Sequence, residues 1–154
     1  MYNKEQASLV KESFWRALGQ KMSTQLSYDG EKTKWINYET GVRHLAFKMD
    51  ADRHTAIIKI EISHPDPGIH ELMYEQFLEI RPLVEDYLQD DWVWIYKQKN
   101  SSGKEISSIY NILENVNIFR PSDQQEIYYF FRKELIALDA MWCNLNPAFE
   151  IFKD

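Results

Sequence analysis

The sequence has a single cysteine, Cys143. One thiol cannot form a disulfide within the chain, so packing and hydrogen bonds have to hold the fold together. A chain so poor in cysteine is typical of a reducing compartment, and we expect a cytoplasmic protein. Because Cys143 lies in the apolar stretch Ala140–Cys143, the sequence favours a buried structural thiol over a nucleophile.

Glycine is also scarce, with 5 in 154 residues. P-loops, dinucleotide-binding loops, hydrolase nucleophile elbows and kinase loops depend on closely spaced glycines, and none of these motifs occurs. No uncharged apolar run approaches the ~20 residues that cross a membrane, and the charged N-terminal residues do not resemble a signal peptide. No repeat or Gly/Ser/Pro-rich linker divides the sequence, so residues 1–154 are expected to form one domain with no membrane segment.

Acidic and aromatic side chains, by contrast, are abundant. The 24 Asp and Glu exceed the 18 Lys and Arg, which gives a net charge of −6. This balance argues against binding of a polyanion over the whole surface and leaves room only for a local basic patch. Hydrophobic residues make up 44% of the chain and aromatic residues 14%, which is enough to build a large core.

Three main helices are predicted from apolar residues that recur every three to four positions. The first spans residues 4–26, the second residues 67–88, and the third begins after residue 121. Asp66 is the expected N-cap of the second helix, and Pro82 is expected to kink it or split it in two. Ser122 is the expected N-cap of the third helix.

Five strands are predicted from two-residue alternation and short apolar runs, at residues 34–38, 42–50, 54–63, 92–99 and 104–113. The second and third of them form a central hairpin. The sequence therefore predicts an α+β fold of order αβββαββα, with a mainly antiparallel five-stranded sheet flanked by helices. The first six elements follow the core order of restriction-endonuclease-like folds, so an architecture of that kind is a further expectation.

The central hairpin carries alternating polar side chains that point to one possible chemistry. Two carboxylates and a lysine on one face can hold Mg²⁺ and orient a water for attack on a phosphodiester. Asp50, Glu61 and Lys59 are the candidate catalytic residues of such a nuclease, and Asp50, Asp52 and Glu61 are the candidate metal ligands. The nuclease motif, however, has a lysine two positions after its second carboxylate, whereas this chain has Ser63 there.

The same side chains have a purely structural interpretation. Charges that alternate on two paired strands can form cross-strand ion pairs on a solvated sheet face. In that case the hairpin register is expected to place Lys48 or Asp50 opposite a residue of opposite charge, Lys59 or Glu61. This interpretation needs no metal.

Histidines and aromatic residues give weaker signals. The four histidines show no recognised ligand spacing, so a zinc site is not expected. His64 ends a predicted strand and faces the start of the second helix, where it is placed to contact an anion. Three aromatic residues share one face of a predicted strand, either packed beneath a helix or exposed as a platform for nucleic-acid bases: Trp92, Trp94 and Tyr96.

Several spaced segments resemble a bacterial family of domains of unknown function, whose members occur alone or at the C-terminal end of restriction-endonuclease-like proteins. The resemblance covers residues 12–145 and implies an association with nucleic-acid or defence systems, without assigning a role to any residue. The segments that carry it are Phe14–Trp15, Lys34–Tyr38, Thr40–His44, Phe47–Asp52, Ile60–Pro67 and Tyr74–Phe77.

Two hypotheses of function follow. The first is a non-catalytic binding or interaction module that needs no cofactor and whose partner is nucleic acid or a nuclease-like protein. The second is a Mg²⁺-dependent nuclease built on Asp50, Glu61 and Lys59. If the family domain normally docks onto a partner domain, a stand-alone chain is expected to cover the same surface by forming a homodimer.

Overall fold

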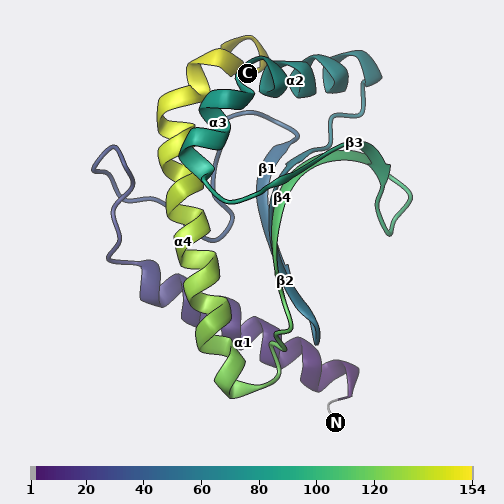
Figure 1. Ribbon diagram of the computed structural model, residues 1–154. Coiled ribbons are helices and arrows are strands. Elements are labelled where there is room, and N and C mark those ends of the chain that lie inside the picture. The colour runs from purple at the N-terminus through teal and green to yellow at the C-terminus, as the bar shows by residue number, and fades with distance from the viewer. Residues whose placement is uncertain (1–2, 154) are drawn as a thin grey trace.

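The computed structural model describes residues 3–153 (Figure 1). Its elements are α1 (Lys4–Met22), β1 (Leu45–Ala51), β2 (Thr55–Ile62), α2 (Pro67–Glu79), α3 (Arg81–Leu88), β3 (Val93–Lys99), β4 (Glu105–Glu114), α4 (Pro121–Leu145) and the short 3₁₀ helix η1 (Asn146–Phe152). The fold class α+β is confirmed.

The helix boundaries follow from local chemistry. Asn3 and Gln6 cap the start of α1 by bonding each other's backbone N–H groups. Asp66 caps α2 as predicted, through a 3.0 Å bond from the Ile69 N–H. The predicted break at Pro82 is also confirmed, because α2 ends at Glu79 and a separate α3 begins at Arg81.

The N-cap predicted for the last helix is wrong by two residues. Arg120 occupies the N-cap position and Pro121 the first helical position, so Ser122 already lies inside α4. Asp123 stabilises this entry instead, because its carboxylate accepts a 2.9 Å bond from the Asn117 N–H and contacts the Arg120 guanidinium at 3.3 Å. At its other end α4 stops at Leu145, and Asn146 caps it and begins η1.

Within residues 3–153 the sheet has four strands, in the order β1-β2-β4-β3, and all neighbours are antiparallel. The predicted fifth strand at residues 34–38 is wrong. Asn37 adopts a left-handed conformation with φ 58°, which interrupts extended backbone, and the Trp35 indole turns inward to donate to the Gln25 carbonyl. An aromatic-rich run thus forms an irregular segment that packs onto the core.

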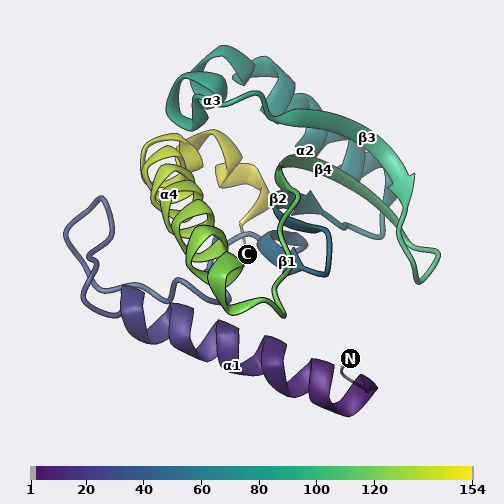
Figure 2. The same cartoon turned by 60° about the horizontal axis from the view of Figure 1, so that its bottom comes forward.

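The core lies between the sheet and the long helix α4. Figures 1 and 2 show α4 along one side of the strands and α1 crossing their lower end. The alternate residues Ala56, Ile58, Ile60 and Ile62 of β2 are at most 1% exposed and face this core. From α4, Ile127, Phe131, Leu135 and Leu138 pack into the same cluster. Among the described residues, no helix is long and apolar enough to span a lipid bilayer.

Candidate functional site on the outer face of the sheet

The face of the sheet that points away from the core is here called the outer face. Strand register arranges its side chains in three rows that run across the strands. The first row is Ala46, Glu61, Ser108 and Ile95; the second is Lys48, Lys59, Tyr110 and Val93; the third is Asp50, Ile57 and Ile112.

Glu61, in the first of these rows, is the buried charge of this face. Although it lies on the side away from the core, it is only 5% exposed, between Ala46 and Ser108 on the neighbouring strands. Its two carboxylate oxygens are each paired: Lys48 Nζ lies 2.6 Å from Oε2, and Lys59 Nζ lies 3.3 Å from Oε1. Burial alone would raise the pKa of Glu61, but the hydrogen bond from Lys48 and the two lysine charges outweigh it and lower the pKa.

The predicted pairing of opposite charges across the hairpin is wrong. Lys48 lies directly opposite Lys59, a like-charge pair that by itself would be destabilising. Glu61 lies two residues from Lys59 on the same face, and it contacts both ammonium groups. The register is tolerated because one carboxylate compensates two facing lysines.

The predicted nuclease residues do not all come together. Asp50 pairs with Ile57 in the register, whereas Glu61 pairs with Ala46, so roughly 13 Å of strand separates the two carboxylate positions. The Asp50 side chain is 73% exposed and contacts Lys11 of α1 at 3.7 Å. Lys59 and Glu61 are in contact, but they form an ion pair with each other.

Asp52, the third predicted metal ligand, lies in the turn of the hairpin. Its carboxylate accepts 2.8 Å bonds from the N–H groups of His54 and Thr55. Partial burial would raise the pKa of Asp52, but these hydrogen bonds outweigh it and lower the pKa. They make Asp52 a residue that shapes the turn. In the part of the chain that the structure describes, no three His, Cys, Asp or Glu side chains form a group that could hold a metal ion.

Around the ion pairs, the outer face is apolar. Val93 is 39% exposed and Ile112 is 37% exposed, which is high for β-branched residues within strands. Ile57, Ile95 and Tyr110 are partly exposed beside them. The face therefore combines partly solvated apolar side chains with a charged centre, a composition found at protein–protein interfaces.

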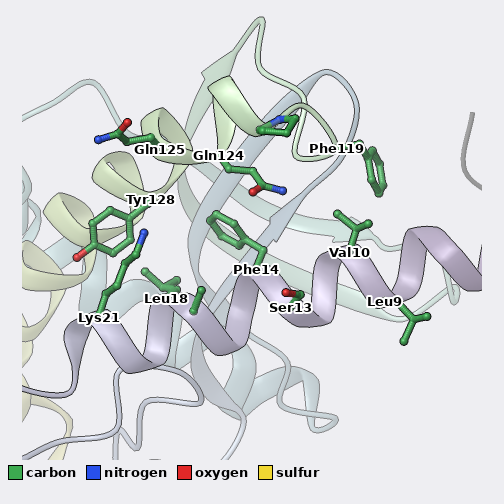
Figure 3. A pocket seen from close by; sticks show the side chains of 12 residues that line it. Leu9, Val10, Ser13, Phe14, Leu18, Lys21, Phe119, Gln124, Gln125 and Tyr128 are labelled. Carbon is green, nitrogen blue, oxygen red and sulfur yellow. The ribbon is translucent and has the colours of Figure 1, made fainter.

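A second apolar feature is a groove between α1 and the start of α4, with a volume of about 560 Å³ (Figure 3). Phe14 and Leu18 of α1 form its floor, and Phe119 and Tyr128 stand on the opposite side. The Lys21 ammonium lies 4.6 Å from the centre of the Tyr128 ring. Sequence analysis did not predict this groove, because it depends on how two distant helices cross.

The predicted aromatic stripe packs beneath a helix. Tyr74 of α2 lies against Trp94 and Tyr96, with ring centres 6.3 and 5.0 Å apart, and Trp92 is buried. Arg81 covers the Trp94 ring at 4.5 Å. Tyr96 keeps 42% of its surface exposed, but Trp92 is buried and Trp94 is covered by Tyr74 and Arg81, so the contacts favour the packing interpretation over a platform of three rings for bases.

Two buried carboxylates on α4 were missed. Asp139 is 2% exposed and accepts hydrogen bonds from the Ser27 hydroxyl, the Tyr28 N–H and the Tyr38 hydroxyl. Glu134 is 1% exposed and accepts a 3.2 Å bond from the Asn111 amide. Both acids lie at helical spacing among the apolar residues of α4, and this spacing is a signal of burial that the sequence did contain.

Cys143 lies beside Asp139 and is half-buried. Its Sγ is 3.4 Å from the Ser27 hydroxyl and 3.6 Å from Asp139 Oδ1. Burial raises the pKa of the Cys143 thiol, with the Asp139 charge acting in the same direction. A raised pKa disfavours the thiolate, so the surroundings fit the predicted structural thiol.

These features define an α+β protein with a four-stranded antiparallel sheet, one face of which packs on helices. A family model, described as a domain of unknown function (DUF4268), matches residues 10–146. The chain belongs to this DUF4268 family. The matched span includes every described strand and therefore the whole outer face. Comparison with curated proteins found no match, and neither did comparison with solved structures.

Proposed function

We propose that the protein is a non-catalytic interaction module that binds a partner protein through the outer face of its sheet. One observation carries this proposal: partly exposed apolar side chains of β2, β3 and β4 share the outer face with a paired and buried Glu61. A carboxylate held by two lysines is poorly suited to bind a metal or move a proton, whereas the apolar surround gains free energy when a partner covers it.

The charges of the face indicate what the partner presents. Lys48 and Lys59 share one carboxylate, so the centre of the outer face carries one uncompensated positive charge. The Lys48 side chain is 56% exposed and has three N–H donors, more than Glu61 alone uses. A complementary partner places a carboxylate beside Lys48 and apolar side chains over Ile112 and Val93.

A protein fits this face better than nucleic acid does. The acidic side chains of Asp50 and Glu61 lie on the same face as the two lysines, and the chain has a net charge of −6. Neither property favours binding to the phosphate backbone of a nucleic acid. The sequence resembles domains that occur at the C-terminal end of nuclease-like proteins. The proposed partner is therefore a nuclease-like domain.

Selection from a phage library of random 16-residue peptides tests the proposal even though the partner is unidentified. Peptides selected on the wild type are expected to carry an acidic residue flanked by apolar ones. Synthetic copies are expected to bind Ile112→Asp and Lys48→Met at least about tenfold more weakly. Leu26→Asp is the matched control, since Leu26 is a 48% exposed aliphatic residue that belongs to none of the strands of the sheet, and it should bind as the wild type does.

Three results would contradict the proposal. Selected peptides could bind both outer-face variants with unchanged affinity, which would place their site elsewhere. Sedimentation could show that the wild type forms dimers that Ile112→Asp dissociates, which would make a second copy the occupant. Cleavage of DNA or RNA that requires Mg²⁺ and is lost in Glu61→Ala would favour the nuclease hypothesis instead.

A further inference from the structure

The groove between α1 and the start of α4 is walled by two helices (Figure 3). Its lining runs along α1 from Leu9 to Lys21, a length of roughly 18 Å at the helical rise per residue. The opposite wall runs along α4 from Pro121 to Tyr128. The backbone groups of α1 are hydrogen-bonded within the helix, so this wall offers none to an extended peptide. A third helix, which bonds its own backbone, is the element that fits the groove.

The groove has a basic end, and none of the 12 described residues that line it is acidic. At this end the Lys21 ammonium lies 4.6 Å from the centre of the Tyr128 ring. One turn further along α4, the Arg132 guanidinium donates a 3.2 Å hydrogen bond to the side-chain oxygen of Gln25. Among the described residues, neither cation forms an ion pair with a carboxylate. Both therefore keep N–H donors for a carboxylate that another molecule brings.

Away from its basic end, the groove is apolar. Phe14 is buried in its floor, and Val10 and Ala17 are partly exposed along the α1 wall. Leu9, at the far end of this wall, is 59% exposed. The helix that occupies the groove is therefore expected to present aliphatic side chains toward one end and a carboxylate toward the other.

Helix α2 of this chain presents such a surface. It has 13 residues and is roughly 20 Å long, close to the length of the α1 wall. Ile69 and Leu72, in its first half, are 38% and 53% exposed, and Glu75 and Glu79, in its second half, are exposed acids. Offsets of three, six and ten residues from Ile69 place all four on one side of the helix. In the part of the chain that the structure describes, neither acid forms an ion pair.

The two surfaces lie far apart in one molecule. Figures 1 and 2 show α2 at one end of the molecule and α1 at the other, so α2 cannot enter the groove of its own chain. A second copy of the chain supplies the same helix without this restriction.

We infer that α2 of one copy docks into the α1–α4 groove of a second copy, with Leu72 over Phe14 and Glu79 beside Lys21. Exposed aliphatic side chains then cover the apolar part of the groove, and acids that lack an ion pair meet cations that lack one. Because the two surfaces differ, the contact is heterologous and links copies into rings or chains. None of its residues belongs to the outer face, so the inference does not depend on the proposed function.

Sedimentation velocity on the full chain, from about 5 to about 500 µM, tests the inference. The sedimentation coefficient of the wild type is expected to rise with concentration. Lys21→Glu and Glu79→Lys, both at exposed positions, are each expected to weaken self-association at least about tenfold, because like charges then face each other. The double variant Lys21→Glu/Glu79→Lys restores opposite charges and is expected to recover it. Lys104→Glu and Glu31→Lys are matched controls, since both residues are exposed and lie outside the two surfaces.

A wild type that stays monomeric up to about 500 µM would overturn the inference. Self-association that both single charge reversals leave unchanged, or that the double variant does not recover, would overturn it as well. Dissociation by Ile112→Asp instead would assign the contact to the outer face. Amide chemical shifts of the wild type give a test without variants: shifts that change with protein concentration are expected at Lys21, Leu72 and Tyr128, and changes confined to another surface would contradict the assignment.

Discussion

The Tyr38 hydroxyl donates a 2.6 Å hydrogen bond to the carboxylate of Asp139, and it joins an irregular N-terminal segment to the C-terminal half of α4. Burial and the Asp139 carboxylate both raise the pKa of Tyr38, so the hydroxyl stays a donor. Ser27 and Tyr28 add bonds of 2.8 and 2.7 Å to the same carboxylate. One buried acid therefore fixes residues 27–38, which have no regular strand to hold them.

We predict that Asp139→Asn lowers the free energy of unfolding by at least about 2 kcal/mol, because an amide accepts fewer hydrogen bonds and its NH₂ group faces other donors. Tyr38→Phe removes a single hydrogen bond and is expected to lower the free energy of unfolding by about 1 kcal/mol. Urea unfolding measures both changes. An Asp139→Asn variant as stable as the wild type would show that this carboxylate does not hold the segment.

Glu61→Gln is predicted to lower the free energy of unfolding by about 1–3 kcal/mol, since it removes the charge that compensates two facing lysines. A second variant, Lys48→Met in the Glu61→Gln background, relieves the repulsion and should recover part of the loss. The melting temperature of the wild type in about 5 mM Mg²⁺ should equal its melting temperature without Mg²⁺. A rise in the wild-type melting temperature with Mg²⁺, absent in Glu61→Gln, would contradict this structural role.

Glu134 is predicted to make stability depend on pH. Burial is the main cause that raises its pKa from 4.5 to about 7, and Asp90 acts in the same direction, against the Asn111 hydrogen bond and the Lys133 charge. A carboxyl whose pKa is raised by folding stabilises the fold fully below its unfolded value near 4.5, and this contribution is lost as pH rises through 7.

Glu134→Gln mimics the protonated acid, so it is expected to be more stable than the wild type at pH 8 and about equally stable at pH 5. Urea unfolding at both pH values measures the difference. Glu126→Gln is a suitable control, because Glu126 is an exposed acid on the same helix and should show no such pH dependence. An equal effect of Glu134→Gln at the two pH values would rule out titration of Glu134 as the cause.

A bulge in β3 places one residue in a strained backbone conformation. The register of β3 with β4 shifts between Ile95 and Gln98, and Lys97 within this bulge has a left-handed conformation with φ 49°. Glycine adopts this conformation without strain, so Lys97→Gly is expected to leave stability unchanged or raise it by up to about 1 kcal/mol. The bond from the Lys97 N–H to the Ser107 hydroxyl is retained in that variant. Ile95→Gly, at a regular position, should be clearly destabilising, and a loss of the same size in Lys97→Gly would argue against strain at the bulge.

The parts of the fold that the sequence predicted are those governed by local chemistry. Alternation in the central hairpin, the Asp66 cap and the break before Pro82 each depend on a few adjacent residues, and each is confirmed. The strand predicted at residues 34–38 failed because contacts with distant residues decide that segment. Composition there favours a strand, yet the left-handed Asn37 and the inward-turned Trp35 prevent one.

The sequence predicted only part of the candidate site, again because contacts between distant residues decide the rest. Alternation placed Lys48, Lys59 and Glu61 on one face, but no local pattern specified the register that sets Lys48 opposite Lys59. The burial of Asp139 and Glu134 was accessible in principle. Spacings of three and four residues from Phe131 and Leu135 place both acids within the apolar stripe of α4, where a charge has to be paired or protonated.

The strand order β1-β2-β4-β3 also has a kinetic consequence. The β1–β2 and β3–β4 hairpins each join strands adjacent in the chain, whereas β2 and β4 meet only after α2, α3 and β3 have been spanned. Closing that long loop costs conformational entropy before the central pair of strands is gained. We therefore expect the two hairpins to form early and independently, and the docking of Ile60 against Ile109 at their junction to limit the rate at which the native sheet assembles.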